Sequence, residues 1–430
     1  MYLRAKSLMP GGTQLLSKRP EMYLPDQWPA YASRASGVDI WDLDDSHYVD
    51  MTTTAIAACP LGFADPDVND AVKLAIDAAS MTTLNCPEEV ELAELLVTLH
   101  PWAEQVRFAR GGGEAMAIAV RIARAATGRS TVAFSGYHGW HDWYLAANLA
   151  NEAALDGHLL PGLDPTGVPR SLAGSALPFQ FNSTSQFDAI INLHGSELAA
   201  VIIEPTREHL PEPGFLEHLR DRTSQVGAAL IFDEVSAGWR LAVGGSHLLF
   251  GVEPDIAVFA KAISNGFPMA AVIGRRVVME AAQRSFISST YWTEKIGPVA
   301  ALTTIRKLQQ KDGPAYFSAI GRLVRDGWSE ISHSHGLPIA VHGHPAFGGF
   351  SFVDEQGGLL ASSFTQGMLE KGYLANPAFC ATLAHTDQHI QRYLEHANDV
   401  FGVLSALHRS GRLDSYLHGP IAHDRFRRLT

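Results

Sequence analysis

Cysteine is scarce in this sequence, and the cysteines present are not spaced as pairs. The 430 residues include three, Cys59, Cys86 and Cys380, and no CxxC motif. An odd number without paired spacing argues against a disulfide framework and against a zinc cage. We therefore expect no metal site and reduced thiols in a cytoplasmic protein, with one shielded catalytic cysteine as the alternative.

Basic clusters and long apolar runs are also missing. The formal net charge is −12, and the Lys and Arg residues do not gather into the organised basic face that nucleic acids and anionic membranes require. The N-terminal MYLRAKSLMPGG has no continuous apolar region, and no stretch approaches the length of a membrane span. We expect small-molecule partners, with no nucleic acid and no membrane.

The sequence does have many apolar residues, arranged in short runs. With 46% hydrophobic residues, the chain can bury one large core and a smaller companion. After Pro101, runs of strand length alternate with helical stretches: QVRFA, STVAF, LAAVIIEP, GAALIFDE, DIAVFA and AAVIG. This alternation predicts an α/β fold with a mostly parallel central sheet and helices on both faces.

The two ends of the chain have a different pattern. GVDIWDLDDSHYVDM predicts a hairpin outside the main sheet, and the chain after about residue 306 indicates helices around further strands. We expect residues 76–305 to form the large domain, and residues 1–75 and 306–430 to form a smaller α+β domain. Residues 145–185, rich in Gly, Pro and Asn, are expected to make a surface excursion that can act as a lid.

The stretch IFDEVSAGWR places a carboxylate, Asp233, at the end of an apolar run. Ligands of open α/β sheets bind at the carboxyl ends of such strands, so Asp233 should face the ligand. A buried acid needs a counterpart, which can be a cation, a metal or a protonated ring nitrogen. A structural salt bridge is the alternative.

Two further strand ends carry groups with chemical potential. Gly111, Gly112 and Gly113 lie between a strand and a helix, where bare N–H groups favour an anion such as phosphate, although a merely tight turn is equally compatible. No GxGxxG or Walker motif is present. Lys261 follows the strand DIAVFA directly, which favours an amine nucleophile over a solvated surface charge.

The segment FSGYHGWHDWY gathers aromatic residues after another strand. Tyr137 and Trp140 can stack on a planar ligand. The histidines, His138 and His141, are more often structural than ligands, and they lack the carboxylate or cysteine neighbours of a metal site.

Together these segments resemble the class III (subgroup II) aminotransferases of the type I pyridoxal-phosphate fold, and most closely the glutamate-1-semialdehyde aminomutase-like branch. The resemblance covers nearly the whole chain. It rests on the ordered motifs LMPGGTQ, IWDLDDSHYVD, GFADPDV, ELAELL, VRFARGGGEA, RIARAATGR, YHGW, VIIEP, PGFLEHLR, IFDEVSAGWR, PDIAVFAKAISNGFP and AHTDQHIQRYL.

The resemblance implies pyridoxal 5'-phosphate as the cofactor and assigns roles to residues of this chain. Asp233 would pair with the pyridinium nitrogen, and Lys261 would hold the cofactor as a Schiff base and shuttle the proton. Val235 and Tyr137 would pack on the two ring faces. The remaining cofactor contacts implied are His138, Glu204 at the ring edge, Gly112 and Gly113 at the phosphate, and Thr290 from the partner of a homodimer with shared active sites.

The chain departs from the family pattern at three places. Family members commonly have SGTEA or NGSEA where this chain has GGGEA, so only backbone N–H groups remain to bind phosphate. The segment STYWTEK keeps Thr290 but replaces the small residues that follow, which makes Trp292 and Glu294, with Trp140, candidates for substrate contact. The aminomutase branch binds the substrate carboxylate with an arginine near the N-terminus. This chain has Lys18 and Arg19 around that place, and a lysine cannot form the two parallel hydrogen bonds that an arginine forms with a carboxylate.

We expect a transaminase that moves an amino group from an amino donor to a ketone or aldehyde acceptor in a biosynthetic pathway. Two alternatives remain open. An aminomutase would return the amino group to a neighbouring carbon of the same substrate, and a degenerate cofactor-binding protein would show no turnover.

Overall fold

The computed structural model describes residues 1–158, 161–207 and 209–424, and it divides the chain into two units. The larger unit is Pro66–Pro314, and the smaller one combines Met1–Asp65 with the chain from Ala315 onward. The breaks lie at residues 65 and 314, where we expected 75 and 305. Helix α3 (Pro66–Asp77) belongs to the larger unit because it packs on α12 (Ile296–Gln310), with an ion pair of 2.6 Å between Asp67 and Lys307.

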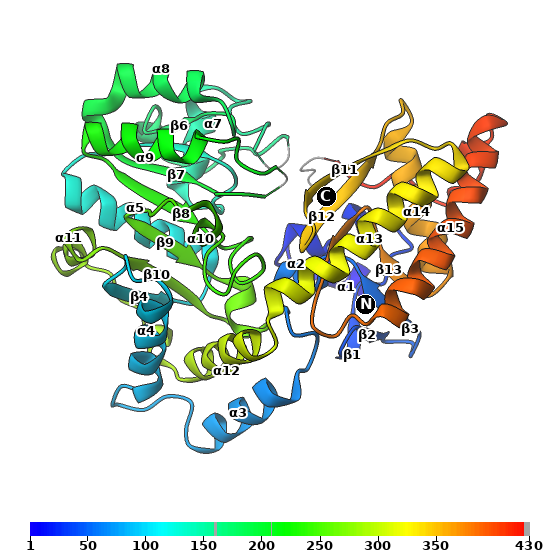
Figure 1. Cartoon of the computed structure of the whole chain (residues 1–430), viewed down its shortest axis with the longest axis horizontal. Coiled ribbons are helices and arrows are strands. Elements are labelled where there is room, and N and C mark those ends of the chain that lie inside the picture. Colours follow the sequence, from blue (N-terminus) through cyan, green and yellow to red (C-terminus); the bar gives the residue numbers. More distant parts are fainter. Residues whose placement is uncertain (159–160, 208, 425–430) are drawn as a thin grey trace. The chain divides into compact units, whose positions relative to one another are not determined.

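The larger unit is built on a seven-stranded sheet in the order β4-β10-β9-β8-β7-β5-β6 (Figure 1). Its strands are β4 (Gln105–Ala109), β5 (Thr131–Ser135), β6 (Ala176–Pro178), β7 (Leu198–Ile203), β8 (Ala229–Asp233), β9 (Ile256–Phe259) and β10 (Ala270–Gly274). Neighbouring pairs from β9 to β6 are parallel, whereas β10 runs antiparallel to both β9 and β4. The expected α/β fold with a mostly parallel sheet is confirmed.

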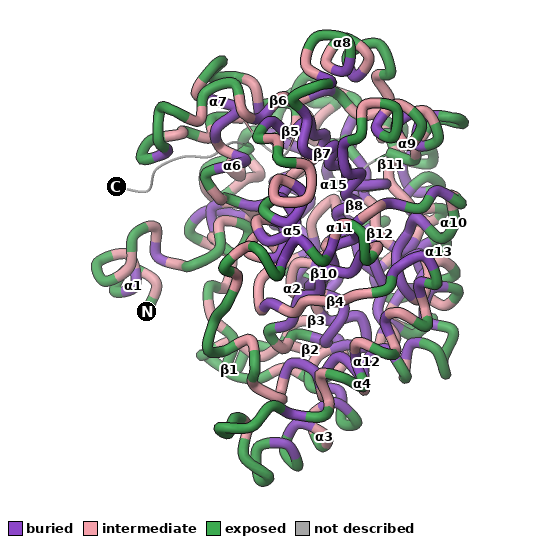
Figure 2. The backbone as a smooth tube through the Cα atoms, turned by 90° about the vertical axis from the view of Figure 1, so that its left-hand side faces the viewer, coloured by how far each residue is buried: buried purple, intermediate pink, exposed green. Residues whose placement is uncertain are grey.

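The helices cover both faces of this sheet, because alternate side chains of each strand point to opposite sides. Ile202, Ile231 and Val258 pack with α5 (Gly112–Thr127) on one face. Val201 and Leu230 pack on the other face with α8 (Thr184–His194) and α9 (Phe215–Val226). Strands β5, β7 and β8 are therefore buried along their whole length, as Figure 2 shows. The other helices of this unit are α4 (Pro87–Leu99), α6 (Asp142–Leu145), α7 (Ala147–Ala150), α10 (His247–Phe250) and α11 (Arg276–Met279).

Residues 145–185 differ from the expected surface excursion. They contain the edge strand β6, which pairs in parallel with β5, and they bury Leu155 and Val168 in the same core as α5. Sequence patterning missed β6 because it has three residues and ends on Pro178, and proline is compatible with a strand only at a sheet edge or terminus. Residues 159–160 lie outside the described chain, and the role of the segment as a lid stays a prediction.

The smaller unit contains two small sheets. One has the order β1-β2-β3-β13, in which the hairpin of β2 (Asp39–Asp42) and β3 (His47–Met51) confirms the expected antiparallel element, and β13 (Tyr373–Ala375) pairs in parallel with β3. The other has the order β11-β12-β14. The remaining elements are α1 (Tyr2–Leu8), β1 (Ala32–Ser36), α2 (Thr54–Ala57), α13 (Gly313–His335), β11 (Ile339–His344), β12 (Phe347–Phe352), α14 (Gly357–Glu370), β14 (Ala378–Cys380) and α15 (Asp387–Arg409).

In the part of the chain that the structure describes, no helix combines the length and the apolar character needed to cross a membrane. All three cysteines are buried, and none of them forms a disulfide.

Candidate active site

Two chemically active side chains lie at the ends of neighbouring strands. Strand β8 ends at Asp233, which is in register with Val258 of the parallel strand β9. Lys261 begins the 3-10 helix η5 (Lys261–Ser264) just after β9. Its φ of +49° lies in the left-handed region, a costly conformation for a non-glycine residue that is common at functional sites.

Asp233 is buried and held by polar contacts on both of its oxygens. Oδ2 lies 2.8 Å from Nδ1 of His138, and Oδ1 accepts the N–H of Val235 at 3.0 Å. Nε2 of His138 faces the carbonyl oxygen of Ser135 at 3.1 Å. Both ring nitrogens of His138 therefore face oxygen atoms. These contacts fix the orientation of the Asp233 carboxylate.

Asp233 and Glu234 are adjacent in sequence but contact different partners, because Asp233 ends β8 and Glu234 follows it. The Glu234 carboxylate accepts the N–H groups of Ser246 and His247 and contacts His247 Nδ1 at 2.8 Å. Burial pushes the pKa of Glu234 upward, but the hydrogen bonds and charge of His247 outweigh it and lower that pKa. Both oxygens of Glu234 are thus occupied by Ser246 and His247.

The Lys261 amine is positioned by a side chain that sequence patterning did not identify. Lys261 Nζ donates to Oγ of Ser236 at 2.9 Å. Ser236 is buried in the loop that follows β8, so the same short loop carries the acid and the partner of the amine. The available sequence signal was a hydroxyl in the loop directly after Asp233.

The start of α5 lies against these loops. A Cβ atom built on Gly112 would lie 2.9 Å from Cγ1 of Val235 and 3.5 Å from Cβ of Ala260. No side chain caps the helix at Gly111, so the first backbone N–H groups are available to an anion. A bare helix N-terminus, a fixed carboxylate and an amine on adjoining loops fit the phosphate, the ring nitrogen and the aldehyde of pyridoxal phosphate.

Glu204 holds the loop that carries Tyr137. Its buried carboxylate, just after β7, accepts the Tyr137 N–H through Oε2 at 3.0 Å and lies 3.3 Å from Arg207 Nη1. The Tyr137 ring packs edge-on against Tyr144, with centroids 5.7 Å apart. Burial raises the pKa of Tyr137, so its hydroxyl stays protonated at neutral pH.

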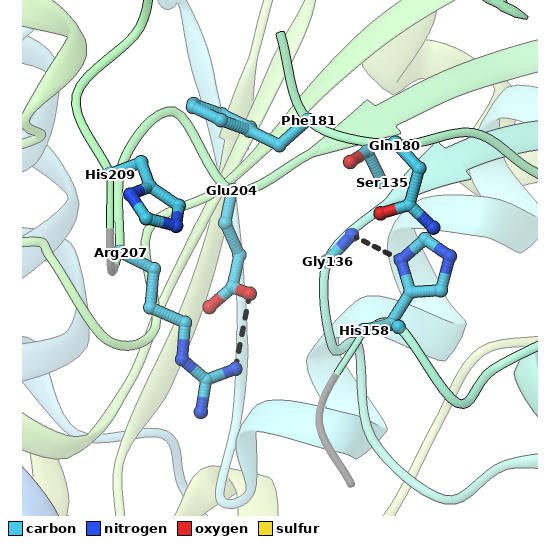
Figure 3. Close-up of a pocket in the computed structure, with 9 residues that line it drawn as sticks. Ser135, Gly136, His158, Gln180, Phe181, Glu204, Arg207 and His209 are labelled. Atoms are coloured by element: carbon cyan, nitrogen blue, oxygen red, sulfur yellow. Dashed lines mark hydrogen bonds and ion pairs between the residues drawn. The ribbon is translucent and has the colours of Figure 1, made fainter. Parts of the chain in front are cut away.

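A pocket opens beside Glu204, and Figure 3 shows the side chains that line it. Arg207 pairs with Glu204 on one side, and on the other side His158 Nδ1 accepts the Gly136 N–H at 3.2 Å. Gln180 and Phe181 complete part of the wall. The pocket thus combines a cation, neutral polar groups and an aromatic ring.

The residues expected near the substrate have different surroundings. Thr290 is exposed at the start of the 3-10 helix η7 (Thr290–Thr293), and Trp292 is partly buried against the α5 core. The Glu294 carboxylate contacts Nε of Arg110 at 2.7 Å and accepts the Ile296 and Gly297 N–H groups at the start of α12. These contacts give Glu294 a structural role, and its contact with substrate stays a prediction.

Trp140 and Lys18 are both exposed. The Trp140 ring is stacked on that of His141, with centroids 4.4 Å apart. Lys18 belongs to the smaller unit, where it lines a pocket with Tyr48 and Asp50. Their contacts with substrate stay predictions. Among the described residues, no group of three or more His, Cys, Asp and Glu side chains is arranged to hold a metal ion.

The sequence of this chain is similar to those of known proteins. A family model described as Aminotransferase class-III matches residues 24–401. The chain is 32% identical over 381 residues to the 2'-deamino-2'-hydroxyneamine transaminase of Streptomyces kanamyceticus, which covers 86% of this chain and 91% of that protein. It is 33% identical over 430 residues to the glutamate-1-semialdehyde 2,1-aminomutase of Chloroflexus aurantiacus, covering 97% and 94%.

A solved structure agrees with these matches. The structure of the PLP internal aldimine form of the FumI protein from Sphingopyxis sp. MTA144 is similar to this chain with a TM-score of 0.86 and 25% identity. The similarity covers 95% of this chain and 96% of that one.

The half-buried His158 predicts a pH dependence of stability. Burial lowers its pKa from 6.5 to about 4, so between these values the unfolded chain binds a proton that the folded chain does not. Stability should therefore be complete above about pH 6.5 and fall as the pH drops toward 4. We expect His158→Asn, which keeps an acceptor for the Gly136 N–H, to make this loss shallower, as measured by urea unfolding midpoints.

The matched control is His209→Asn, because His209 is an exposed residue of the same pocket. Its midpoints should run parallel to those of the wild type over the same pH range. Some slope should remain in His158→Asn, because burial also lowers the pKa of His100 to about 4. Identical slopes for His158→Asn and the wild type would contradict the assignment.

Proposed function

We propose, since the chain belongs to the class III aminotransferase family, that Asp233 and Lys261 carry the chemistry of a pyridoxal-phosphate-dependent transaminase. The observation that supports these two roles most directly is that Asp233 and Lys261 lie at the ends of adjacent strands. The Asp233 carboxylate contacts His138, and the Lys261 amine donates a hydrogen bond to Ser236. Bound pyridoxal phosphate supplies an aldehyde that takes up the amino group and a ring that withdraws electrons. The chain supplies binding, orientation and proton transfer.

Asp233 would pair with the ring nitrogen and keep it protonated. A buried carboxylate that already contacts His138 has lone pairs left, because each oxygen can accept two hydrogen bonds. Its fixed orientation means that no reorganisation is needed when negative charge develops on the ring.

Lys261 would hold the cofactor covalently through Nζ and, once released by the substrate amine, carry the proton between the substrate carbon and the cofactor. Ser236 Oγ, 2.9 Å from Nζ, supports this because it gives the free amine a resting position in the loop that follows β8. The strained backbone at Lys261 fixes where the side chain starts.

The remaining cofactor contacts would come from the start of α5 and from the loops around it. Gly112 and Gly113 would give backbone N–H groups to the phosphate, with Val235 and Tyr137 on the two faces of the ring. Glu204 would act at the edge of the ring through the Tyr137 loop, whose N–H it accepts. His138 would act through Asp233.

The substrates are an amino donor and a carbonyl acceptor, and we propose a biosynthetic role with an acceptor that carries a ring or hydroxyl groups. The support is limited to the exposed aromatic residues Trp140 and Tyr291 and to the transaminase from Streptomyces kanamyceticus, whose name describes a hydroxyneamine substrate. Aminomutase activity remains the rival, since an aminomutase is equally similar in sequence. Trp292 and Lys18 are retained as candidate substrate contacts.

We also propose a homodimer with shared active sites. Thr290 supports this, because its exposed position on η7 leaves it available to the phosphate of a partner subunit. A cytoplasmic location is part of the same proposal, supported by the absence of a disulfide among the three cysteines.

The role of Lys261 is tested by Lys261→Ala. Turnover should fall by at least about 100-fold, because both the covalent attachment and the proton carrier are lost. Borohydride reduction should fix the cofactor to the Lys261 peptide of the wild type and to no peptide of the variant, as read by mass spectrometry. The exposed Lys73→Ala is the control and should behave as the wild type. Full activity in Lys261→Ala would sink the assignment.

The reaction type is tested by adding amines and amino acids one at a time to the cofactor-loaded protein. We expect at least one donor to abolish the yellow absorbance of the bound cofactor and to release its matching carbonyl compound. Conversion of a substrate into its own positional isomer, without a second carbonyl product, would instead identify an aminomutase.

The assembly is tested by light scattering on the cofactor-loaded protein. A mass of twice the monomer is expected, since each site would need Thr290 from a second subunit. A monomeric mass in an enzyme with full turnover would overturn the shared site while leaving the roles of Asp233 and Lys261 intact.

A further inference from the structure

His141 occupies the space where a side chain at the start of α5 would lie. A Cβ atom built on Gly113 would be 3.3 Å from Nδ1 of His141 and 3.5 Å from its Cε1. Gly113 is the second residue of the helix, within the turn whose N–H groups have no intrahelical partner. The imidazole of His141 therefore lies where a side chain at position 113 would otherwise be.

The loop that carries His141 is fixed against the helix. Gly139 has a φ of +98°, and a Cβ atom on it would lie 2.8 Å from the Cα of Gly113. Both the backbone conformation and the close approach require glycine at position 139. Since His141 follows two residues later, its ring has little freedom to leave the helix start.

Nδ1 of His141 is buried and has no hydrogen-bond partner among the described residues. A buried polar atom without a partner costs free energy, so native structures rarely retain one unless a ligand or a water satisfies it. The other ring contact of His141 is the stacking of Trp140, which leaves Nδ1 unsatisfied. The orphaned atom lies at the end of α5 where an anion is favoured.

The charge state of the ring suits donation to an anion. Burial lowers the pKa of His141, against the opposing effect of Glu114 and Asp142, so the ring is neutral at neutral pH. A neutral imidazole donates through one nitrogen, and in the Nδ1–H tautomer that donor would lie next to Gly113, at the start of α5. Gly111, Gly112 and Gly113 offer no side-chain donor of their own.

We propose that His141 donates its Nδ1–H to the phosphate group of the cofactor and supplies the side-chain contact that the three glycines cannot. This role rests on the proposed position of the phosphate at the start of α5. It makes His141 a cofactor-binding residue with no part in the proton transfer assigned to Lys261.

The test compares two ligands that differ only in the phosphate. Dissociation constants for pyridoxal phosphate and for pyridoxal are measured by absorbance titration of the apoprotein, for the wild type and for His141→Ala. Losing a hydrogen bond to a charged group should weaken pyridoxal phosphate by about 10- to 100-fold and leave pyridoxal unchanged. His141→Asn, which keeps a donor near the Nδ1 position, should recover part of the affinity.

A second variant restores the donor from the helix itself. In His141→Ala the ring is gone, so adding Gly113→Thr should place a hydroxyl in the vacated space and strengthen pyridoxal phosphate binding again. The same Gly113→Thr change in the wild type should not help, because its Cβ would meet the His141 ring at 3.3 Å.

The outcomes separate this proposal from the proposed function. Equal weakening of pyridoxal and pyridoxal phosphate would mean that His141 only supports the loop, and unchanged affinity for both would exclude the phosphate contact. Either result overturns the inference while the wild type still binds cofactor through Lys261. Failure of the wild type to bind pyridoxal phosphate at all would instead overturn the proposed function.

Discussion

The buried carboxylate of Asp233 needs a second polar group to replace the water that it loses on burial. A buried polar group without a partner costs free energy, so the loop after β5 must bring His138 to the end of β8. That requirement fixes the loop between Ser135 and His141, because the other nitrogen of His138 is tied to the Ser135 carbonyl. The same loop carries Tyr137 and is held by Glu204 from the next strand. The contact between Asp233 and His138 thus brings groups that follow β5 and β7 to the end of β8.

Close backbone approach is the second constraint, and it explains why glycine replaces functional side chains here. The start of α5 packs against Val235 on one side and against Gly139 and His141 on the other. A side chain at Gly112 would meet Val235, so the helix start is sandwiched between the loop of the acid and the loop of the aromatic residues. A bare N-terminus binds anions through its N–H groups and dipole without any side chain. Because this packing leaves no room for a side chain on the helix start, any side-chain contact to an anion there has to come from another loop.

Strands and their terminal residues could be predicted from the sequence, whereas contacts between loops could not. The apolar runs ending at Asp233 and before Lys261 gave the correct strands, because burial on both faces leaves no polar alternation to confuse the pattern. The edge strand β6 lacks such a run and was missed. Ser236 contacts Lys261, and His141 lies next to Gly113, so both meet residues that are distant in sequence. Nothing in the sequence around Ser236 or His141 distinguishes them from other loop residues. Glu294 was expected at the substrate because it lies in the segment that follows Thr290; its contact with Arg110, 184 positions away, could not be read from the sequence.

The separation of cofactor machinery from substrate contacts explains why transaminases and an aminomutase are similarly related to this chain. In the proposed function, Asp233, His138 and Lys261 would act only on the cofactor ring and on the proton, which both reactions share. The choice between the two reactions would then depend on residues outside that set. In the segment from Thr290 to Lys295, the Glu294 carboxylate is committed to Arg110 and to the start of α12. Arg110 also donates to the Trp292 carbonyl oxygen, so the end of η7 that carries Trp292 is anchored. The bulky replacements in this segment are therefore held in place where substrate selection can act on them.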